Sequence, residues 1–580
     1  MRWHTCSQAL ALLLLVHTRS VVGIDWNQCF IDIMENANAT NNLAGLLNLN
    51  GDPVSNISDA TGISYSLCTS FCGSGWHFQW SAFAQDFSSW LLPFLALISQ
   101  LPFGAQDRFD NLMSAVLTVG SPVLAGYSLI VTLLNSRWIN RQFRQAVNYP
   151  NSGIAVSIVS SLQQVPLDLH SDPIHFASLV ILPENDCWWK YFSQMALVDY
   201  SHSTWSIASG TSIVWVVVSY ILSITSYVQS STSLSGVASN VADGGATGSM
   251  WLWLISIVVG WLLLSPKCDH KRLESAYEQA GQHARAGTEY AHPPAFAEKA
   301  LTITAQDKDV VSPDELLTPP VFNYSRSLQW ASTAEKIFLA YKKASGKAEG
   351  RIPVHSDSPD DWAEPNDSES KSIHPDNRHG SDDQIIAYCA AQPRSRWAPG
   401  VFTRMAQASC ASLALQWGTV GGAIMIEWFT PTIGLGCRSL GYLIYGAVST
   451  AIWIMLLISS VLAHYSGPRS SSQALPARVA LVFSHLLRWM GKLLAIANSI
   501  WVIVTCIFQY SYFYDTCYCN SSMIIRGKTA GYMTIMETTA QVAQTKSAWI
   551  GGLVLACASA AAFVVFVSLF MDTLKPEPSA

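Results

Sequence analysis

Charged side chains are scarce in this sequence. Only 12% of its 580 residues are Asp, Glu, Lys or Arg, whereas an ordinary soluble domain carries about 25%. Half of the residues are hydrophobic and the mean hydropathy is +0.24. The formal net charge of -6 offers no basic stripe for nucleic acid. These shortages exclude a soluble enzyme, a nucleic-acid-binding protein and a disordered scaffold, and they predict an all-α polytopic bundle in contact with the lipid bilayer.

Catalytic motifs are missing as well. The sequence contains no GxGxxG, GxxxxGK[ST], HExxH, GxSxG or EF-hand pattern, so we predict no cofactor, no metal site and no enzymatic activity. The apolar runs have almost no ionisable residues at their centres, which disfavours an ion-coupled carrier. Glu427 is the one acidic residue inside such a run. It could bind a cation or a basic partner, or reach the outer headgroup region.

The first 23 residues read as a secretory signal peptide. Arg2 supplies the positive charge, Ala9 to Val16 is a short apolar stretch, and Gly23 is a small residue at a cleavage position. The alternative is an uncleaved signal anchor. In both cases the following region, residues 24–87, is expected outside the membrane.

Long uncharged runs predict the membrane spans. A crossing helix needs about 20 apolar residues, and seven runs meet this length: 112–135, 207–229, 246–265, 408–430, 440–463, 490–512 and 548–571. They form a first membrane region, 112–265, and a second, 408–571. An eighth candidate, 88–104, is short and contains Pro93 and Pro102, so we interpret it as an interfacial or re-entrant helix, with a true span as the alternative. Pro122 could break the first span, although a plain kink is commoner.

The distribution of Lys and Arg sets the expected orientation. With seven spans and an outside start, most basic residues fall in the pieces 136–206, 266–407 and 464–489, as the positive-inside rule requires. The tail, 572–580, is then cytoplasmic, in a cell or secretory-pathway membrane. Three sequons fall outside and are predicted glycosylation sites, Asn38, Asn56 and Asn520, whereas those at Asn323 and Asn366 fall inside and should stay bare.

Six cysteines lie outside in this topology: Cys29, Cys68, Cys72, Cys437, Cys517 and Cys519. They are the disulfide candidates, because an oxidising compartment favours bridges. The N-terminal region holds an odd number of them, so full pairing requires at least one bridge to an outer loop. Cys517 and Cys519 are poorly spaced to pair with each other. The sequence leaves the pairing open, and free buried thiols are the alternative.

The 266–407 piece is the largest segment outside the membrane and the place where protein partners are expected. Residues 274–286 and 325–347 have helical patterns. The second carries an apolar stripe that suits either the inner membrane surface or packing against the bundle. Residues 350–384 are rich in Ser, Asp and Pro and too polar to build a core, so we expect disorder there.

Four stretches resemble uncharacterised polytopic integral membrane proteins of filamentous fungi: SSWLLPFLALISQLPFG (88–104), YSLIVTLLNSRWINRQF (127–143), FNYSRSLQW (322–330) and QYSYFYDTCYCNSS (509–522). The resemblance implies a fungal origin and an integral membrane location. It carries no activity, cofactor or catalytic residue onto this sequence.

Two functions fit these observations. The first is a non-enzymatic membrane protein for sensing, scaffolding or interaction, because the mass outside the membrane is concentrated in 24–87 and 266–407. The alternative is a transporter, or an accessory protein, for a small neutral or apolar molecule such as a secondary metabolite, because the span centres are uncharged.

Overall fold

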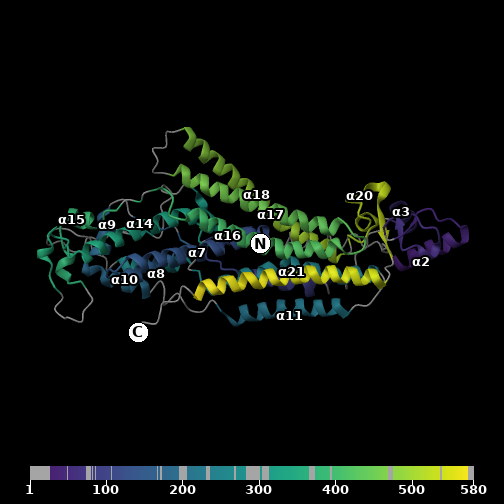
Figure 1. The fold of residues 1–580 in the computed structure, drawn as a ribbon, viewed down its shortest axis with the longest axis horizontal. Coiled ribbons are helices and arrows are strands. Elements are labelled where there is room, and N and C mark those ends of the chain that lie inside the picture. The colour runs from purple at the N-terminus through teal and green to yellow at the C-terminus, as the bar shows by residue number, and fades with distance from the viewer. Residues whose placement is uncertain are drawn as a thin grey trace, which may run out of the picture.

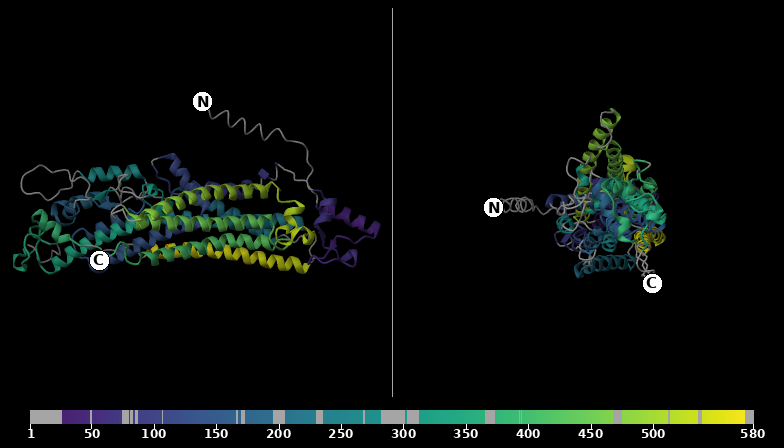
Figure 2. Two further views of the ribbon diagram at one scale, coloured as in Figure 1. Left: turned by 90° about the horizontal axis from the view of Figure 1, so that it is seen from above. Right: turned by 90° about the vertical axis from the view of Figure 1, so that its left-hand side faces the viewer.

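Helices dominate the computed structural model, as the sequence predicted. The structure describes residues 26–572 except 49, 74–79, 81–82, 85–86, 106, 166, 170–172, 195–204, 230–234, 267–268, 282–300, 303–311, 365–372, 392, 394, 468–474, 512 and 536–538. The predicted signal peptide and nearly all of the tail 572–580 therefore lie outside the described residues. Figure 1 shows an elongated molecule, with long helices between two smaller ends, and Figure 2 shows it from above and along its long axis.

Five helices are long and apolar enough to cross a membrane. They are the Gly244–Leu264 part of α12 (Ser235–Leu264), α16 (Val401–Trp428), α17 (Cys437–Ser466), α18 (Leu475–Tyr510) and the Val542–Met571 part of α21 (Thr539–Asp572). Each coincides with one of the seven predicted runs. α11 (Ile207–Gln229) coincides with a sixth, but its apolar part, Ile207–Leu222, is shorter. Apolar side chains such as Phe483, Leu493 and Val554 are exposed on the outside of these helices, as contact with lipid requires.

The remaining predicted run, 112–135, is not one straight span. It is divided between α6 (Arg108–Gly120) and α7 (Pro122–Ala146), which meet at an angle of 105°. Counting this pair as one span gives up to six candidates instead of seven. The plain kink expected at Pro122 is therefore wrong, because the chain turns sharply at Ser121 and a new helix begins.

Residues 88–104, for which the sequence predicted an interfacial or re-entrant helix, contain two short helical pieces. They form the end of a π-helix (Phe87–Leu91) and α5 (Leu92–Ile98). Phe94 is buried and stacks on Trp251 of α12, with ring centroids 6.1 Å apart. Ser209 of α11 donates a hydrogen bond to Gln100 at 2.8 Å. One face of the segment therefore packs against the bundle, because its aromatic and amide side chains find partners on α11 and α12, while Leu92 and Phe103 on its other side are exposed.

One end of the molecule, which we call the base, consists of shorter helices around α14 (Asn323–Glu349). Its other helices are α8 (Ser152–Ser161), α9 (Pro173–Ile181), α10 (Asp186–Ser193), α13 (His270–Gly281) and α15 (Asp382–Cys389). α14 coincides with the helix predicted for 325–347, and its apolar stripe is buried. Phe338 packs against Phe143 of α7, with centroids 5.6 Å apart. Of the two placements left open, packing against the bundle is the observed one.

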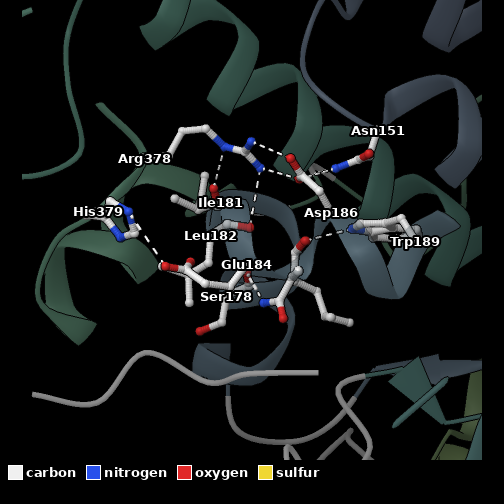
Figure 3. A network of polar contacts seen from close by, with 11 residues as sticks. Asn151, Ser178, Ile181, Leu182, Glu184, Asp186, Trp189, Arg378 and His379 are labelled. Carbon is white, nitrogen blue, oxygen red and sulfur yellow. Dashed lines mark hydrogen bonds and ion pairs between the residues drawn. The ribbon is translucent and has the colours of Figure 1, made fainter. Parts of the chain in front are cut away.

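The expected disorder of 350–384 is wrong for the residues that the structure describes there, 350–364 and 373–384. Figure 3 shows the reason. The Arg378 side chain is 4% exposed and pairs with Asp186 at 2.8 Å. It also donates to the carbonyl oxygen of Ile181 at 2.8 Å. A buried ion pair and backbone hydrogen bonds thus fix a segment that has too few apolar residues to fix itself.

The opposite end, which we call the head, comprises residues 26–73 and 515–535 and departs from the all-α expectation. It contains α2 (Trp26–Thr40), α3 (Tyr65–Phe71), α19 (Cys517–Asn520) and α20 (Met523–Ala530). A three-stranded antiparallel sheet has the order β1 (Leu46–Leu47), β2 (Gly62–Ser64), β5 (Tyr532–Thr534). A second, two-stranded sheet joins β3 (Asp168–Leu169) and β4 (Leu301–Thr302) in the base. Strand β5 brings the loop before α21 into register with the N-terminal region.

Candidate functional site: a broken helix within the bundle

The break between α6 and α7 follows from two consecutive residues, Ser121 and Pro122. Pro122 is the first residue of α7, a position where the missing N–H costs nothing and the fixed φ favours a helix start. Ser121 has φ -144° and ψ 88°, outside the helical region. Its hydroxyl accepts a hydrogen bond from the Leu124 amide at 3.3 Å and so caps the new helix. The break is therefore encoded locally.

The end of α6 exposes carbonyl groups that a helix would otherwise satisfy. Neighbouring helices supply the donors. Tyr445 of α17 donates its hydroxyl to the carbonyl oxygen of Val119 at 2.8 Å. Asn498 of α18 donates to the carbonyl oxygen of Gly120 at 2.8 Å and to that of Tyr445 at 3.1 Å. One amide side chain thus ties the broken helix to two others, in a place where unsatisfied backbone groups would be costly.

A second set of bonds connects the break to α16. Ser121 donates to the carbonyl oxygen of Ser449 on α17 at 2.9 Å. The Ser449 hydroxyl donates in turn to the side-chain oxygen of Gln416 on α16. Gln416 donates to the carbonyl oxygen of Gly446 at 2.9 Å. Neutral hydrogen bonds therefore join α16, α17 and α18 to the break between α6 and α7.

We call Ser121, Gln416, Tyr445, Ser449 and Asn498 the helix-break site. All five are buried, with 0 to 2% of each exposed. None carries a charge at neutral pH, so the site can donate and accept hydrogen bonds but cannot bind an ion through a formal charge of its own. The arrangement suits either a fixed joint between helices or recognition of an uncharged group.

Sequence reasoning missed this site because it searched the spans for ionisable residues. A signal was nevertheless present. Gln416 and Asn498 are amides near the middle of otherwise apolar runs, 408–430 and 490–512. A buried amide needs several hydrogen-bond partners, so each predicts close contact with another polar group. The sequence did not predict that Gln416 and Asn498 would both lie beside the same broken helix.

Glu427, the acidic residue singled out from the sequence, is not part of the helix-break site. It is buried in the last turn of α16, about 16 Å along that helix from Gln416 at about 1.5 Å per residue. Burial raises the pKa of Tyr514, and the nearby Glu427 carboxylate adds to that shift. Glu427 therefore lies beside the head.

The six cysteine candidates lie in three pairs at disulfide-bonding distance. Their Cα atoms are 5.4 Å apart in Cys29–Cys72, 6.0 Å in Cys68–Cys517 and 5.0 Å in Cys437–Cys519. One pair joins the N-terminal region to the loop before α21, as the odd number of cysteines requires. The Cys437–Cys519 pair joins α17 to the same loop, and Arg438 strengthens that contact through an ion pair with Asp515 at 2.7 Å.

The predicted glycosylation sites differ in accessibility. Asn38 and Asn56 are exposed on the head. Asn520 is partly buried, and its side-chain oxygen accepts a hydrogen bond from Arg438 at 3.1 Å. Asn323, which we expected to stay bare, is buried and donates to Thr132 at 2.7 Å. Asn366 lies outside the described residues.

Within the described part of the chain, no group of three or more His, Cys, Asp or Glu side chains is placed to hold a metal ion. No protein-family model, no curated protein and no solved structure matches this chain. The function of the helix-break site must therefore be inferred from its own contacts.

Proposed function

We propose that the chain is a multi-pass protein of the cell membrane or of a secretory-pathway membrane, with the head outside and the base and C-terminus in the cytoplasm. The number of membrane crossings is still seven, as the sequence predicted. The first crossing, however, is made by residues 88–104 and not by residues 112–135. α6 and α7 enter from the cytoplasmic side and return to it, with the helix-break site at their tip. The number of crossings before α11 is unchanged, so the positive-inside rule is still satisfied.

The packing of residues 88–104 supports this path. Phe94 contacts Trp251 near the middle of α12, and Gln100 bonds to Ser209 near the start of α11. Because α11 and α12 are consecutive and run in opposite directions, the segment passes alongside both, from the head toward the base.

The two arms of the broken helix support the rest. Asp110 in the first turn of α6 is within electrostatic reach of Lys492. Lys492 in turn pairs with Asp314, which lies just before α14 of the base. Asn135 of α7 accepts a hydrogen bond from Arg404, in the first turn of α16, at 2.8 Å. Both arms therefore extend from the helix-break site toward the base.

A non-enzymatic sensing or scaffolding role has the most support in this arrangement. The observation that carries it is that the helix-break site connects the helices that hold the head to the helix that holds the base. α17 and α18 surround the site, and the Cys437–Cys519 pair links α17 to the head. α7 leaves the site and packs on α14. A displacement of the head would reach the base through this joint, and the base would present it to protein partners.

Hydrogen–deuterium exchange of the full chain in nanodiscs tests this coupling. Replacing both members of one pair, Cys68→Ser with Cys517→Ser, should raise exchange in the head and also in α7 and α14. Cys187→Ser is the matched control, because it removes an exposed thiol of the base that has no cysteine partner, and it should change neither region. Exchange that rises in the head alone would contradict the proposed role.

A second candidate function is passage of a small neutral or apolar molecule. The observation that favours it is the uncharged polar tip of a discontinuous helix, the type of element at which membrane carriers bind their substrates. Proteoliposomes containing the full chain should then pass at least one member of a panel of neutral solutes, and Gln416→Leu should abolish that flux. No flux above empty vesicles, or full flux through the Gln416→Leu variant, would exclude it.

A further inference from the structure

A cavity of about 880 Å³ lies between α7, α16 and α21, away from the helix-break site. One part of its wall is basic and another part is apolar. Arg137, Arg141 and Arg404 line it with positive charge, and Leu134, Phe566 and Phe570 line it with apolar surface. Among the residues that the structure describes, none of those lining the cavity is acidic.

The charges of Arg137 and Arg141 are not neutralised within the described part of the chain, where neither has a carboxylate at ion-pair distance. Both side chains are exposed. The Arg137 guanidinium lies over the Phe570 ring at 4.5 Å, which orients it at the boundary between the two kinds of wall. Two unpaired cations on successive turns of one helix form a binding surface for an anion.

Arg404 gives an independent indication. It is 7% exposed and is held rigidly, because its guanidinium lies 4.2 Å over the Trp138 ring. Its Nε donates to Asn135 at 2.8 Å and its Nη1 to the carbonyl oxygen of Pro399 at 2.8 Å. Its Nη2 is buried without a hydrogen-bond partner. A buried donor without a partner is costly, and an anionic oxygen bound in the cavity would supply the missing acceptor.

We propose that this cavity binds the phosphate headgroup of an anionic phospholipid. The guanidinium fork matches phosphate oxygens, and basic pockets between membrane helices are suited to such headgroups. The apolar wall would contact the upper part of an acyl chain. Val565 and Leu569 of α21 are more than half exposed beside Phe566 and Phe570, so the apolar side continues into the lipid-facing surface. Assignment to the cytoplasmic leaflet rests on the proposed orientation, but the binding itself does not.

Native mass spectrometry of the full chain tests the proposal. The protein is purified from nanodiscs of phosphatidylcholine alone or of phosphatidylcholine mixed with phosphatidylinositol. The wild type should retain phosphatidylinositol and not phosphatidylcholine. Arg137→Gln with Arg404→Gln should lower retention about tenfold or more, since both substitutions remove charged hydrogen-bond donors to the phosphate. Arg144→Gln is the control, because it removes an exposed charge from the same helix outside the cavity and should retain lipid normally.

A second variant guards against misfolding. Arg137→Gln with Arg141→Gln leaves the buried Arg404 contacts intact and should still reduce retention. Equal retention by wild type and both double variants would overturn the proposal, as would equal retention of phosphatidylcholine. Binding of free inorganic phosphate with no retained phospholipid would overturn it too. The proposed sensing role would stand if these variants lost the lipid while hydrogen–deuterium exchange in the head, α7 and α14 stayed normal. The two proposals can therefore fail separately.

Discussion

At the scale of the residue, Gly120 shows how closely the helices approach at the break. A Cβ atom at this position would overlap the carbonyl oxygen of Ala495 on α18. Backbone cannot move aside as a flexible side chain can. Gly421 of α16, by contrast, faces open space. The close packing of α6 on α18 therefore requires glycine at position 120, whereas position 421 has room for a side chain.

We expect Gly120→Ala to destabilise the protein by about 1–3 kcal/mol, the usual cost of overpacking. Gly421→Ala is the control and should be neutral or slightly stabilising, because alanine favours a helix. Thermal unfolding of both variants in the same detergent checks this. A melting temperature that falls equally in both variants would show that the close contact with Ala495 does not exist.

Glu315, between the base and α18, predicts a pH dependence. Burial, with the neighbouring Asp314 carboxylate, raises the pKa of Glu315 from 4.5 to about 8, against the opposing effects of Arg488 and Arg326. The folded state thus binds this proton more tightly than the unfolded state does. Its contribution to stability is complete below pH 4.5 and is lost as the pH rises toward 8.

The free energy of unfolding should therefore fall between pH 5 and pH 8, and Glu315→Gln should remove much of that decline, because a neutral amide has no proton to lose. Chemical unfolding of wild type and variant across this range measures the effect. Parallel pH profiles for the two proteins would mean that Glu315 titrates normally.

At the scale of the element, hydropathy identified the five long apolar helices because burial in lipid requires about 20 apolar residues whatever their partners. It could not predict the path of 88–104 or of α6 and α7. Residues 88–104 look too short and too rich in proline, yet Phe94 and Gln100 find partners inside the bundle. Residues 112–135 have the right composition, but apolar content does not report a change of direction at Ser121.

The broken helix depends on Asn498. Asn498→Ala should leave the carbonyl oxygen of Gly120 without this donor, at a cost of about 1–3 kcal/mol for the unsatisfied group, and should also remove the second bond to Tyr445. Ile500→Ala on the same helix removes an exposed apolar side chain and serves as the control. Thermal unfolding should show a larger loss for Asn498→Ala. The reverse order would mean that the break is held in another way.

At the scale of the whole molecule, the head is connected to the membrane helices through contacts that are distant in sequence. Cys68 and Cys517 are separated by 449 positions, and sequence reasoning could require a bridge of this kind without identifying it. The structure of residues 350–364 and 373–384 was equally hidden, because it depends on the contacts of single side chains such as Arg378. The average composition of a window does not report such contacts.

Peptide mapping under non-reducing conditions should recover three linked pairs, Cys29–Cys72, Cys68–Cys517 and Cys437–Cys519. Cys187 and Cys410 should remain alkylatable throughout, since both are exposed and neither has a cysteine partner. A linked peptide containing both Cys517 and Cys519 would contradict the arrangement of the head.

The path of the chain before α11 is the central claim, and the accessibility of residue 107 tests it most directly. Asp107 is exposed between the 88–104 segment and α6. In a background in which Cys187, Cys268 and Cys410 are replaced by Ser, Asp107→Cys should react with an impermeant maleimide only after the cells are permeabilised, whereas Glu35→Cys on the head should react in intact cells. Labelling of Asp107→Cys in intact cells would place this turn outside and contradict a first crossing at 88–104.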